Sequence, residues 1–291
     1  DSSPSRGLGD VYKRQVTAFT VMGLHDKRAL KMTSGQILLE GEDITNASPA
    51  VFRARRGEKM AMIFQEPMTA LNPVLKVGDQ ISEMLKIHTS MTASERKARV
   101  IRAMNDVDLP DPEMMYKSYP HQLSGGQRQR IMIAMALVME PGLLIADEPT
   151  TALDVTTQAN ILRLIKEIQR RRGMGVLFIT HDFGVVADIA DRVVVMQEGK
   201  IVEQGTVNEV LKNPSHEYTK MLIGSVPSMK PPKRDQVSGS PALITKQINK
   251  TFGGLGFFGK GRKVHAAKSV SFDIRAGETT GIVGELSLIH I

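Results

Sequence analysis

Short apolar runs alternate with amphipathic stretches along most of the chain, and the spacing of the apolar positions predicts the type of each element. Runs of four to six mostly apolar residues are typical of buried strands, and apolar positions three or four residues apart are typical of helices. The pattern predicts strands at residues 36–40, 59–64, 143–146 and 176–180, and a hairpin of strands 193–196 and 201–203 around a turn at 197–200. It predicts helices at residues 16–32, 77–84, 94–107, 125–139 and 157–172, a turn at 41–43 and a loop at 110–120. Because strands alternate with helices, we expect an α/β fold with a mostly parallel sheet covered on both faces and a small antiparallel β part.

Polar side chains follow three of the predicted strands. Gln65 ends the first, His181 ends the third, and Asp147 with Glu148 ends the strand between them along the chain. In open α/β sheets, ligands bind beyond the carboxyl ends of the strands. The convergence of these polar ends therefore predicts a functional site at that edge of the sheet.

The composition and the hydrophobic periodicity of the sequence change after Gly224. Residues 227–241 are rich in proline and serine and have no periodicity, which is typical of an exposed linker. Strand-like alternation resumes at residues 242–285, where we expect the start of a second domain that includes a strand near 279–283. Residues 1–15 and 286–291 do not continue the pattern beside them, so we interpret them as a non-native leader and tail and leave them out of fold reasoning. The first domain is then predicted to span residues 16–226.

Composition narrows the possible functions. The chain has 291 residues, of which 41% are hydrophobic and 24% charged, an ordinary globular balance. It has no cysteine, which excludes disulfides, thiolate metal sites and a cysteine nucleophile. Its longest apolar run, residues 131–139, is far shorter than the roughly 20 residues of a membrane-spanning helix.

The net charge of +7 is concentrated in one segment. Residues 228–268 hold nine Lys or Arg and one acid, so the rest of the chain carries a net charge of −1. A protein that binds nucleic acid across its main domain needs a basic face there. With no Trp and only 4% aromatic residues, stacking of single-stranded bases is not favoured either. We therefore expect no nucleic-acid partner.

The segment Ser124-Gly125-Gly126-Gln127 places a serine and two glycines at a predicted helix start. Glycine lets backbone N–H groups approach an anion closely, and the helix dipole favours negative charge there. An ordinary helix cap explains the same residues without a ligand.

Asp147 and Glu148 lie at the tip of a buried strand. Because side chains alternate along a strand, one carboxylate can face a metal–phosphate centre while the other reaches an attacking water. The alternative is a pair of solvated acids in a turn. His181 and Gln65 are each weak signals when taken singly.

Taken together, Gln65, residues 124–127, Asp147-Glu148, Asp154 and His181 resemble, in order and spacing, the ATP-binding-cassette (ABC) ATPases. Residues 64–73, 119–123 and 213–219 narrow the resemblance to the dipeptide/oligopeptide/nickel importer ATPases, although that family usually has proline where this chain has Glu217. The resemblance implies an ABC core like that of the P-loop NTPases, with a helical subdomain at about residues 68–121.

The resemblance also implies catalytic roles, with ATP and Mg²⁺ as cofactors. Asp147 would hold Mg²⁺ through water, and Glu148 would be the general base for the attacking water. His181 would contact the γ-phosphate and position Glu148. Gln65 would touch the metal and the water and would lie where the membrane partner docks.

Further residues would bind nucleotide by the same resemblance. Ser124, Gly125, Gly126 and Gln127 would bind the γ-phosphate of the nucleotide held by an opposite cassette, and Asp154 would link the two sites. Phe252 matches the aromatic residue that stacks on adenine in a second cassette, and a core strand position explains it equally well.

The phosphate loop of such ATPases, Gly-x-x-x-x-Gly-Lys-Ser/Thr, does not occur in the sequence. The nearest string, at residues 254–261, fails at the last position. Residues 16–18 look like the family sequence that follows this loop, and residues 281–285 look like the sequence that precedes another. We therefore expect an intact protein with two cassettes in one polypeptide, cut at both phosphate loops.

The resemblance predicts the ATP-binding subunit of an ABC importer for peptides or a related solute such as nickel or glutathione. Its expected partners are transmembrane permease subunits, a substrate-binding protein and a second cassette, at the cytoplasmic face of the plasma (inner) membrane. The alternatives are a soluble tandem ABC ATPase that acts on nucleic acid or ribosomes, and an inactive fragment.

Overall fold

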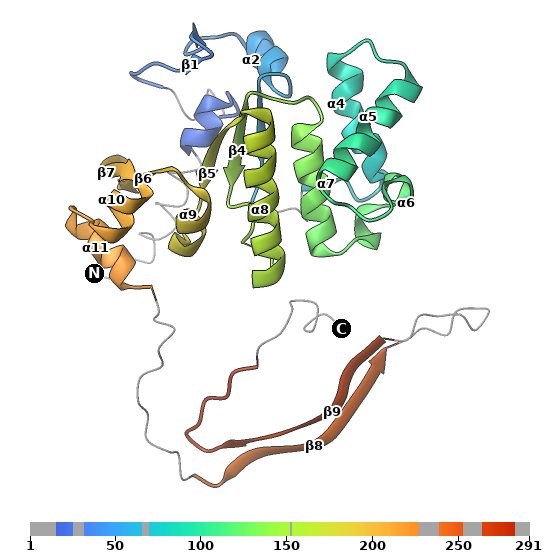
Figure 1. Cartoon of the computed structure of the whole chain (residues 1–291), viewed down its shortest axis with the longest axis vertical. Helices are drawn as coiled ribbons and strands as arrows, with labels where there is room; N and C mark the ends of the chain where they lie inside the picture. Colours follow the sequence, from blue (N-terminus) through green and yellow to red (C-terminus); the bar gives the residue numbers. More distant parts are fainter. Residues whose placement is uncertain are drawn as a thin grey trace. The chain divides into compact units, whose positions relative to one another are not determined.

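The computed structural model describes residues 16–25, 32–65, 70–151, 153–226, 239–252 and 264–282 (Figure 1). It divides into two compact units. The first comprises Asp1–Leu153 and Thr157–Val226, and the second comprises Asp154–Thr156 and Pro227–Ile291.

A three-stranded parallel sheet forms the centre of the first unit. Its strands are β3 (Met60–Ile63), β4 (Leu143–Asp147) and β5 (Gly175–Ile179), in the order β3-β4-β5. In the register, Met62 lies opposite Ile145, and Ile145 lies opposite Leu177. All three carboxyl ends therefore meet at one edge, as the sequence predicts.

The two faces of this sheet are buried in different clusters because side chains alternate along each strand. On one face, Leu144 and Ile63 pack with Ile133 of α7 (Gly125–Leu137) and Ile161 of α8 (Val155–Arg172). On the other face, Ile145 packs with Ala18, Met22, Ile44, Phe52 and Met60. These last residues come from the helix at 16–21 and the turn after it, from α2 (Pro49–Arg55), from β3 and from the loop before α2.

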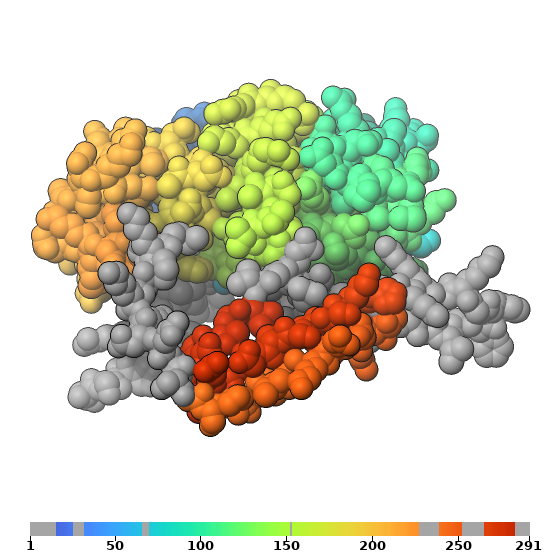
Figure 2. All heavy atoms as spheres, turned by 60° about the horizontal axis from the view of Figure 1, so that its bottom comes forward, coloured from blue at the N-terminus to red at the C-terminus, as the bar shows by residue number. Residues whose placement is uncertain are grey.

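A group of helices packs against α7. It consists of α4 (Val77–His88), α5 (Ala93–Asp106), α6 (Pro112–Lys117) and the 3₁₀ helix η1 (Pro120–Gln122). A capping box fixes the start of α5, because Thr92 accepts from the Glu95 amide while Glu95 accepts from the Thr92 amide. Figure 2 shows α8 exposed between this group and the orange elements that follow β5.

The remaining elements of the first unit are small. They are β1 (Leu38–Leu39), β2 (Glu42–Asp43), α9 (Phe183–Ile189), β6 (Arg192–Gln197), β7 (Lys200–Thr206), α10 (Val207–Lys212) and α11 (Glu217–Gly224). Strands β6 and β7 form the predicted antiparallel hairpin, and Val193, Val195 and Val210 of α10 make a third buried cluster.

The described part of the second unit is dominated by one antiparallel pair, β8 (Pro241–Phe252) and β9 (Val264–Arg275). Phe252 lies at the end of β8 opposite Val264. In the described residues of the whole chain, no helix is long and apolar enough to span a membrane.

Three predictions of local structure are wrong. The helix predicted at 16–32 stops at residue 21, because Gly23 turns the chain with a φ of +60° and Arg56 donates to the carbonyls of Met22 and Gly23. The loop predicted at 110–120 contains α6, whose start is set by Asp111 as cap and Pro112 as first residue.

The third wrong prediction concerns the second unit. Residues 279–282 are not a strand, and Ile282 is largely exposed. A strand needs a neighbour to satisfy its backbone groups, and the described part of this unit has a sheet of two strands, β8 and β9.

Candidate active site

Glu148 lies directly after β4 with an unusual backbone. Its amide donates to the Ile179 carbonyl at 2.9 Å, which extends the pairing of β4 with β5 by one residue. Its φ of +45° is left-handed, a conformation that costs a residue with a Cβ roughly 1–2 kcal/mol. Only 5% of Glu148 is exposed. The fold therefore holds one carboxylate in a strained, nearly buried position at the functional edge.

Three side chains contact this carboxylate. Gln65, after β3, donates from Nε2 to Oε2 at 3.1 Å, and Thr151 donates from Oγ1 to the same oxygen at 3.1 Å. On the other oxygen, Oε1, His181 Nδ1 lies 2.9 Å away. Gln65 and His181 follow the two strands that flank β4, so the predicted convergence of polar strand ends becomes direct contact at Glu148.

His181 differs from its partner in exposure. Its side chain is 60% exposed, whereas that of Glu148 is 5% exposed. In the tautomer that carries its hydrogen on Nδ1, the imidazole donates to Glu148 Oε1 and leaves Nε2 for another group. The pair thus presents a buried carboxylate and an exposed imidazole at one place.

Asp147 is the other carboxylate at the tip of β4, and it is 2% exposed. Among the described residues, no group of three His, Cys, Asp or Glu side chains is arranged to hold a metal ion. Magnesium, however, is commonly bound by one or two carboxylates together with substrate phosphates. The oxygens of Asp147 and the Gln65 amide are donors of the type that Mg²⁺ takes, so the residues present fit that ion.

The predicted anion-binding segment opens α7 with a capping box. Ser124 Oγ accepts from the Gln127 amide at 3.3 Å, and Gln127 Oε1 accepts from the Ser124 amide at 2.9 Å. These residues therefore do cap the helix, and the cap does not exclude a ligand at the same place. A Cβ added at Gly125 would meet nothing within 4 Å, so contacts inside the described chain do not demand a glycine there.

The other predicted nucleotide-binding residues belong to the second unit. Asp154 directly precedes α8, and Phe252 is the last residue of β8. Their roles in linking sites and in stacking on adenine remain predictions. Residues 66–69, Ala152 and residues 254–261 lie outside the described part of the chain.

Thr151 is the site residue that sequence reasoning missed. A threonine three residues after a strand-tip glutamate is an ordinary turn residue, and no motif distinguishes it. Its position becomes informative only when Glu148 is known to adopt a positive φ, because that turn brings the Thr151 hydroxyl back to the carboxylate.

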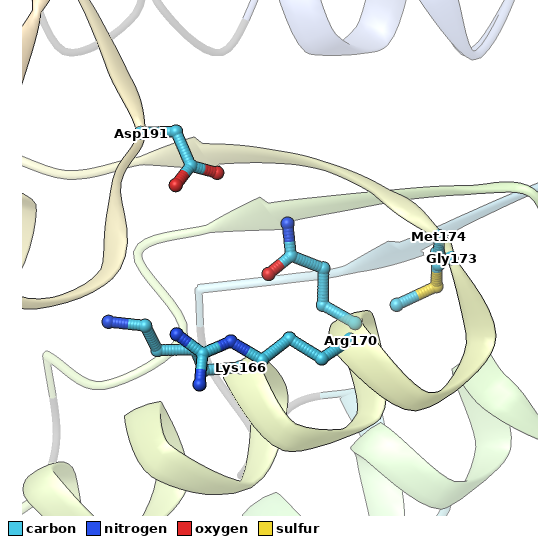
Figure 3. A pocket seen from close by; sticks show the side chains of 6 residues that line it. Lys166, Arg170, Gly173, Met174 and Asp191 are labelled. Atoms are coloured by element: carbon cyan, nitrogen blue, oxygen red, sulfur yellow. The ribbon is translucent and has the colours of Figure 1, made fainter.

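A shallow hollow of about 350 Å³ lies at the opposite end of the sheet (Figure 3). Its lining residues are Lys166, Gln169, Arg170, Gly173, Met174 and Asp191. Gly173 and Met174 directly precede β5, so this hollow borders the amino end of the strand. It is therefore not part of the site around Glu148.

Comparisons with known proteins agree with this geometry. Residues 21–151 match the ABC transporter family, and residues 202–258 match the oligopeptide/dipeptide transporter C-terminal region. The chain belongs to the ABC transporter family. The predicted family and the predicted α/β fold are both confirmed.

Two curated relatives illustrate the similarity. The chain is 45% identical over 276 residues to the "Peptidoglycan transport ATP-binding protein YejF" of Agrobacterium fabrum, covering 94% of this chain and 50% of the relative. It is 43% identical over 304 residues to the "Glutathione import ATP-binding protein GsiA" of Salmonella paratyphi A, covering 94% and 49%. This ABC transporter chain thus spans about half the length of the curated relatives it matches.

A solved structure supports the fold. The ATP-binding cassette MJ0796, in a dimeric post-hydrolysis state bound to ADP and Pi, is similar with a TM-score of 0.58 and 25% identity. The alignment covers 68% of this chain and 81% of that cassette.

Proposed function

We propose that this chain is part of the ATP-binding subunit of an importer, which couples ATP hydrolysis to the uptake of peptides or a related solute such as glutathione or nickel. The match of residues 202–258 to an oligopeptide/dipeptide transporter region supports the peptide class of solute. The glutathione import protein among the relatives supports it as well.

The contact of Gln65 and His181 with Glu148 carries the proposal. A general base must be held within hydrogen-bond reach of the proton that it takes, and two flanking strands fix this carboxylate. Glu148 takes the proton of the attacking water, and His181 orients Glu148 and faces the transferred phosphoryl group. Bound Mg²⁺-ATP supplies that group and the neutralising metal charge, with Asp147 and Gln65 as the oxygen donors toward the metal.

The start of α7 serves a second cassette in this proposal. Ser124 and the backbone N–H groups of Gly125 and Gly126 face a γ-phosphate, Gln127 lies beside them in the same nucleotide-binding segment, and Asp154 links the two sites. The open space at Gly125 supports a close approach by a ligand from outside the chain. Transmembrane permease subunits and a substrate-binding protein complete the importer, which places the chain at the cytoplasmic face of the membrane.

Substitution of Glu148 tests the proposal. Because the sequence contains no phosphate loop, the protein to assay is this chain with a Gly-x-x-x-x-Gly-Lys-Ser loop joined ahead of Val16. Glu148→Gln is expected to lower phosphate release about 100-fold or more, the range for loss of a general base. Binding of a fluorescent ATP analogue is expected to persist, because the amide keeps the shape of the site.

The matched control is Glu167→Gln, which changes an exposed glutamate on α8. It is expected to leave both measurements unchanged. Turnover by Glu148→Gln close to that of the parent would show that Glu148 is not the base.

A further inference from the structure

The first turns of α7 and α8 touch at one close contact. A Cβ added at Gly126 would lie 2.9 Å from Thr157 Cγ2 and 3.9 Å from Thr157 Oγ1. Carbon atoms in contact are normally about 3.5–4.0 Å apart, so only a glycine fits without displacing the threonine. At Gly125 the same added atom would meet nothing within 4 Å. Packing against α8 therefore requires a glycine at position 126 but not at position 125.

The same two helices are also joined at their far ends. Arg172, the last residue of α8, donates from one guanidinium nitrogen to the Leu137 carbonyl at 3.0 Å and from the other to Asp106 at 2.8 Å. A guanidinium at the carboxyl end of α7 also complements the helix dipole. Helices α7 and α8 therefore lie close together at their amino ends and are hydrogen-bonded at their carboxyl ends.

A short, bonded stretch of chain connects Glu148 to this contact. The Thr151 amide donates to the Glu148 carbonyl at 3.4 Å, and the Leu153 amide donates to the Thr150 carbonyl at 3.1 Å. The Thr151 hydroxyl bonds the Glu148 carboxylate, and Thr157 follows within the first turn of α8. Thr157 therefore follows the turn that holds Glu148 after a short stretch of chain.

We propose that the Gly126–Thr157 contact is a positioning device, which makes the Ser124 end of α7 and the turn after Glu148 move together. Gly126 is required for close helix packing, Gly125 remains open toward a ligand, and Thr157 is a positioning residue. The functional meaning of the coupling rests on the roles proposed for Ser124 and Glu148, whereas the coupling itself does not.

Hydrogen exchange on the 291-residue chain without nucleotide tests the coupling. The amides to follow are Arg128, which donates to the Ser124 carbonyl, and Thr151 and Leu153, which report the turn. Gly126→Ala is expected to speed exchange at both places by roughly tenfold, in keeping with one overpacked contact. It is also expected to lower the melting temperature. Gly125→Ala, the matched control, is expected to leave exchange at both places unchanged.

A second substitution removes the clash. Thr157→Ser deletes Cγ2 and keeps the hydroxyl, so the double variant Gly126→Ala/Thr157→Ser is expected to recover slow exchange at both places. By itself, Thr157→Ser only loosens the contact and is expected to speed exchange modestly at both. That single variant decides the matter if Gly126→Ala does not fold.

The proposal is overturned if Gly125→Ala and Gly126→Ala act alike, if the double variant is not rescued, or if exchange rises at Arg128 alone. Since no nucleotide is used, any of these results leaves the proposed role of Glu148 standing. Conversely, an active Glu148→Gln enzyme would remove the catalytic role while the exchange pattern persists.

Discussion

The edge of the sheet at Glu148 and the start of α7 at Ser124 are organised in different ways. Glu148 is contacted by side chains from both flanking strands and from its own turn. Ser124 and Gln127 bond each other, and Gly125, the first of the two glycines between them, faces open space. The carboxylate in the first region is surrounded by the chain's own side chains, whereas Gly125 in the second region is left open.

This difference predicts different responses to substitution. Changes at the sheet edge should affect the chemical step, because the reacting group is already in place. A change at Ser124, unlike one at the closely packed Gly126, should affect what closes onto the start of α7 and leave the fold and the local nucleotide site intact.

The largest effect is expected at Ser124. In a two-cassette protein with phosphate loops, Ser124→Arg puts a long cation where the opposite nucleotide must approach. Turnover at that site is expected to fall about 100-fold or more, comparable to the loss of a preorganised anion donor. Fluorescent-nucleotide binding to the separate cassettes should persist. The two measurements together are the test.

Ser90→Arg, in the exposed loop between α4 and α5, is the control for the added charge. Lost nucleotide binding by a folded Ser124→Arg variant would mean that Ser124 serves its own cassette. Unchanged turnover would mean that residues 124–127 serve only as a helix cap. The start of α7 would then have no role in turnover to compare with that of the sheet edge at Glu148.

A smaller effect is expected at His181. His181→Ala removes the contact to Glu148 Oε1 but leaves the bonds from Gln65 and Thr151 to Oε2. Turnover is expected to fall roughly 10- to 100-fold, less than the 10²–10⁴-fold range for the base itself. Because the His181 side chain is 60% exposed, the melting temperature should stay close to that of the parent.

His88→Ala, at the end of α4, controls for loss of an imidazole elsewhere. A His181→Ala variant that equals the parent in phosphate release would show that Gln65 and Thr151 suffice to position Glu148.

The sequence predicts the sheet edge well because the determinants are local. Each strand is a short apolar run, each ends in a polar residue, and parallel strands necessarily bring those ends to one edge. Gln65, Glu148 and His181 could thus be grouped before any coordinates. Thr151 could not be added to this group, because its contact depends on the positive φ of Glu148, and no pattern in the sequence predicts that φ.

The two glycines of α7 show where sequence reasoning stops. Residue by residue, Gly125 and Gly126 look equivalent, and both suggest an approaching anion. Only the packing of α8 separates them, because Thr157 occupies the space beside one and not the other. Likewise, the helix α6 was hidden by prolines that suggest a loop, although Asp111 before Pro112 is itself a helix-start signal.

Glu203 on β7 gives a third case, a carboxylate whose bonds serve structure. It accepts from the Ser215 amide at 2.7 Å, from the Ser215 hydroxyl at 2.8 Å and from the His216 amide at 3.2 Å. The buried Thr219 hydroxyl beside it and the Ser215 amide lower the pKa of Glu203 to about 2. Unlike Glu148, Glu203 holds the segment before α11 against β7. It belongs to residues 202–258, which match the oligopeptide/dipeptide transporter C-terminal region.

The smallest effect is therefore expected for substitution of Glu203, and it should appear as a change in the melting temperature. A carboxyl whose pKa is lower in the folded state stabilises the fold at pH values above its unfolded pKa of 4.5, and this stabilisation is lost as the pH falls toward about 2. Glu203→Gln is expected to lower the melting temperature at pH 7, and its difference from the parent is expected to shrink as the pH falls toward 2, where about half of the folded-state carboxyls are protonated. Glu217→Gln is the control, because the Glu217 side chain is 87% exposed. Among the described residues its ion-pair partner is Lys220 alone, and an exposed ion pair of this kind contributes little to stability. Melting curves at several pH values decide the matter: a difference between Glu203→Gln and the parent that does not shrink with falling pH would mean that the carboxylate's charge does not hold this segment.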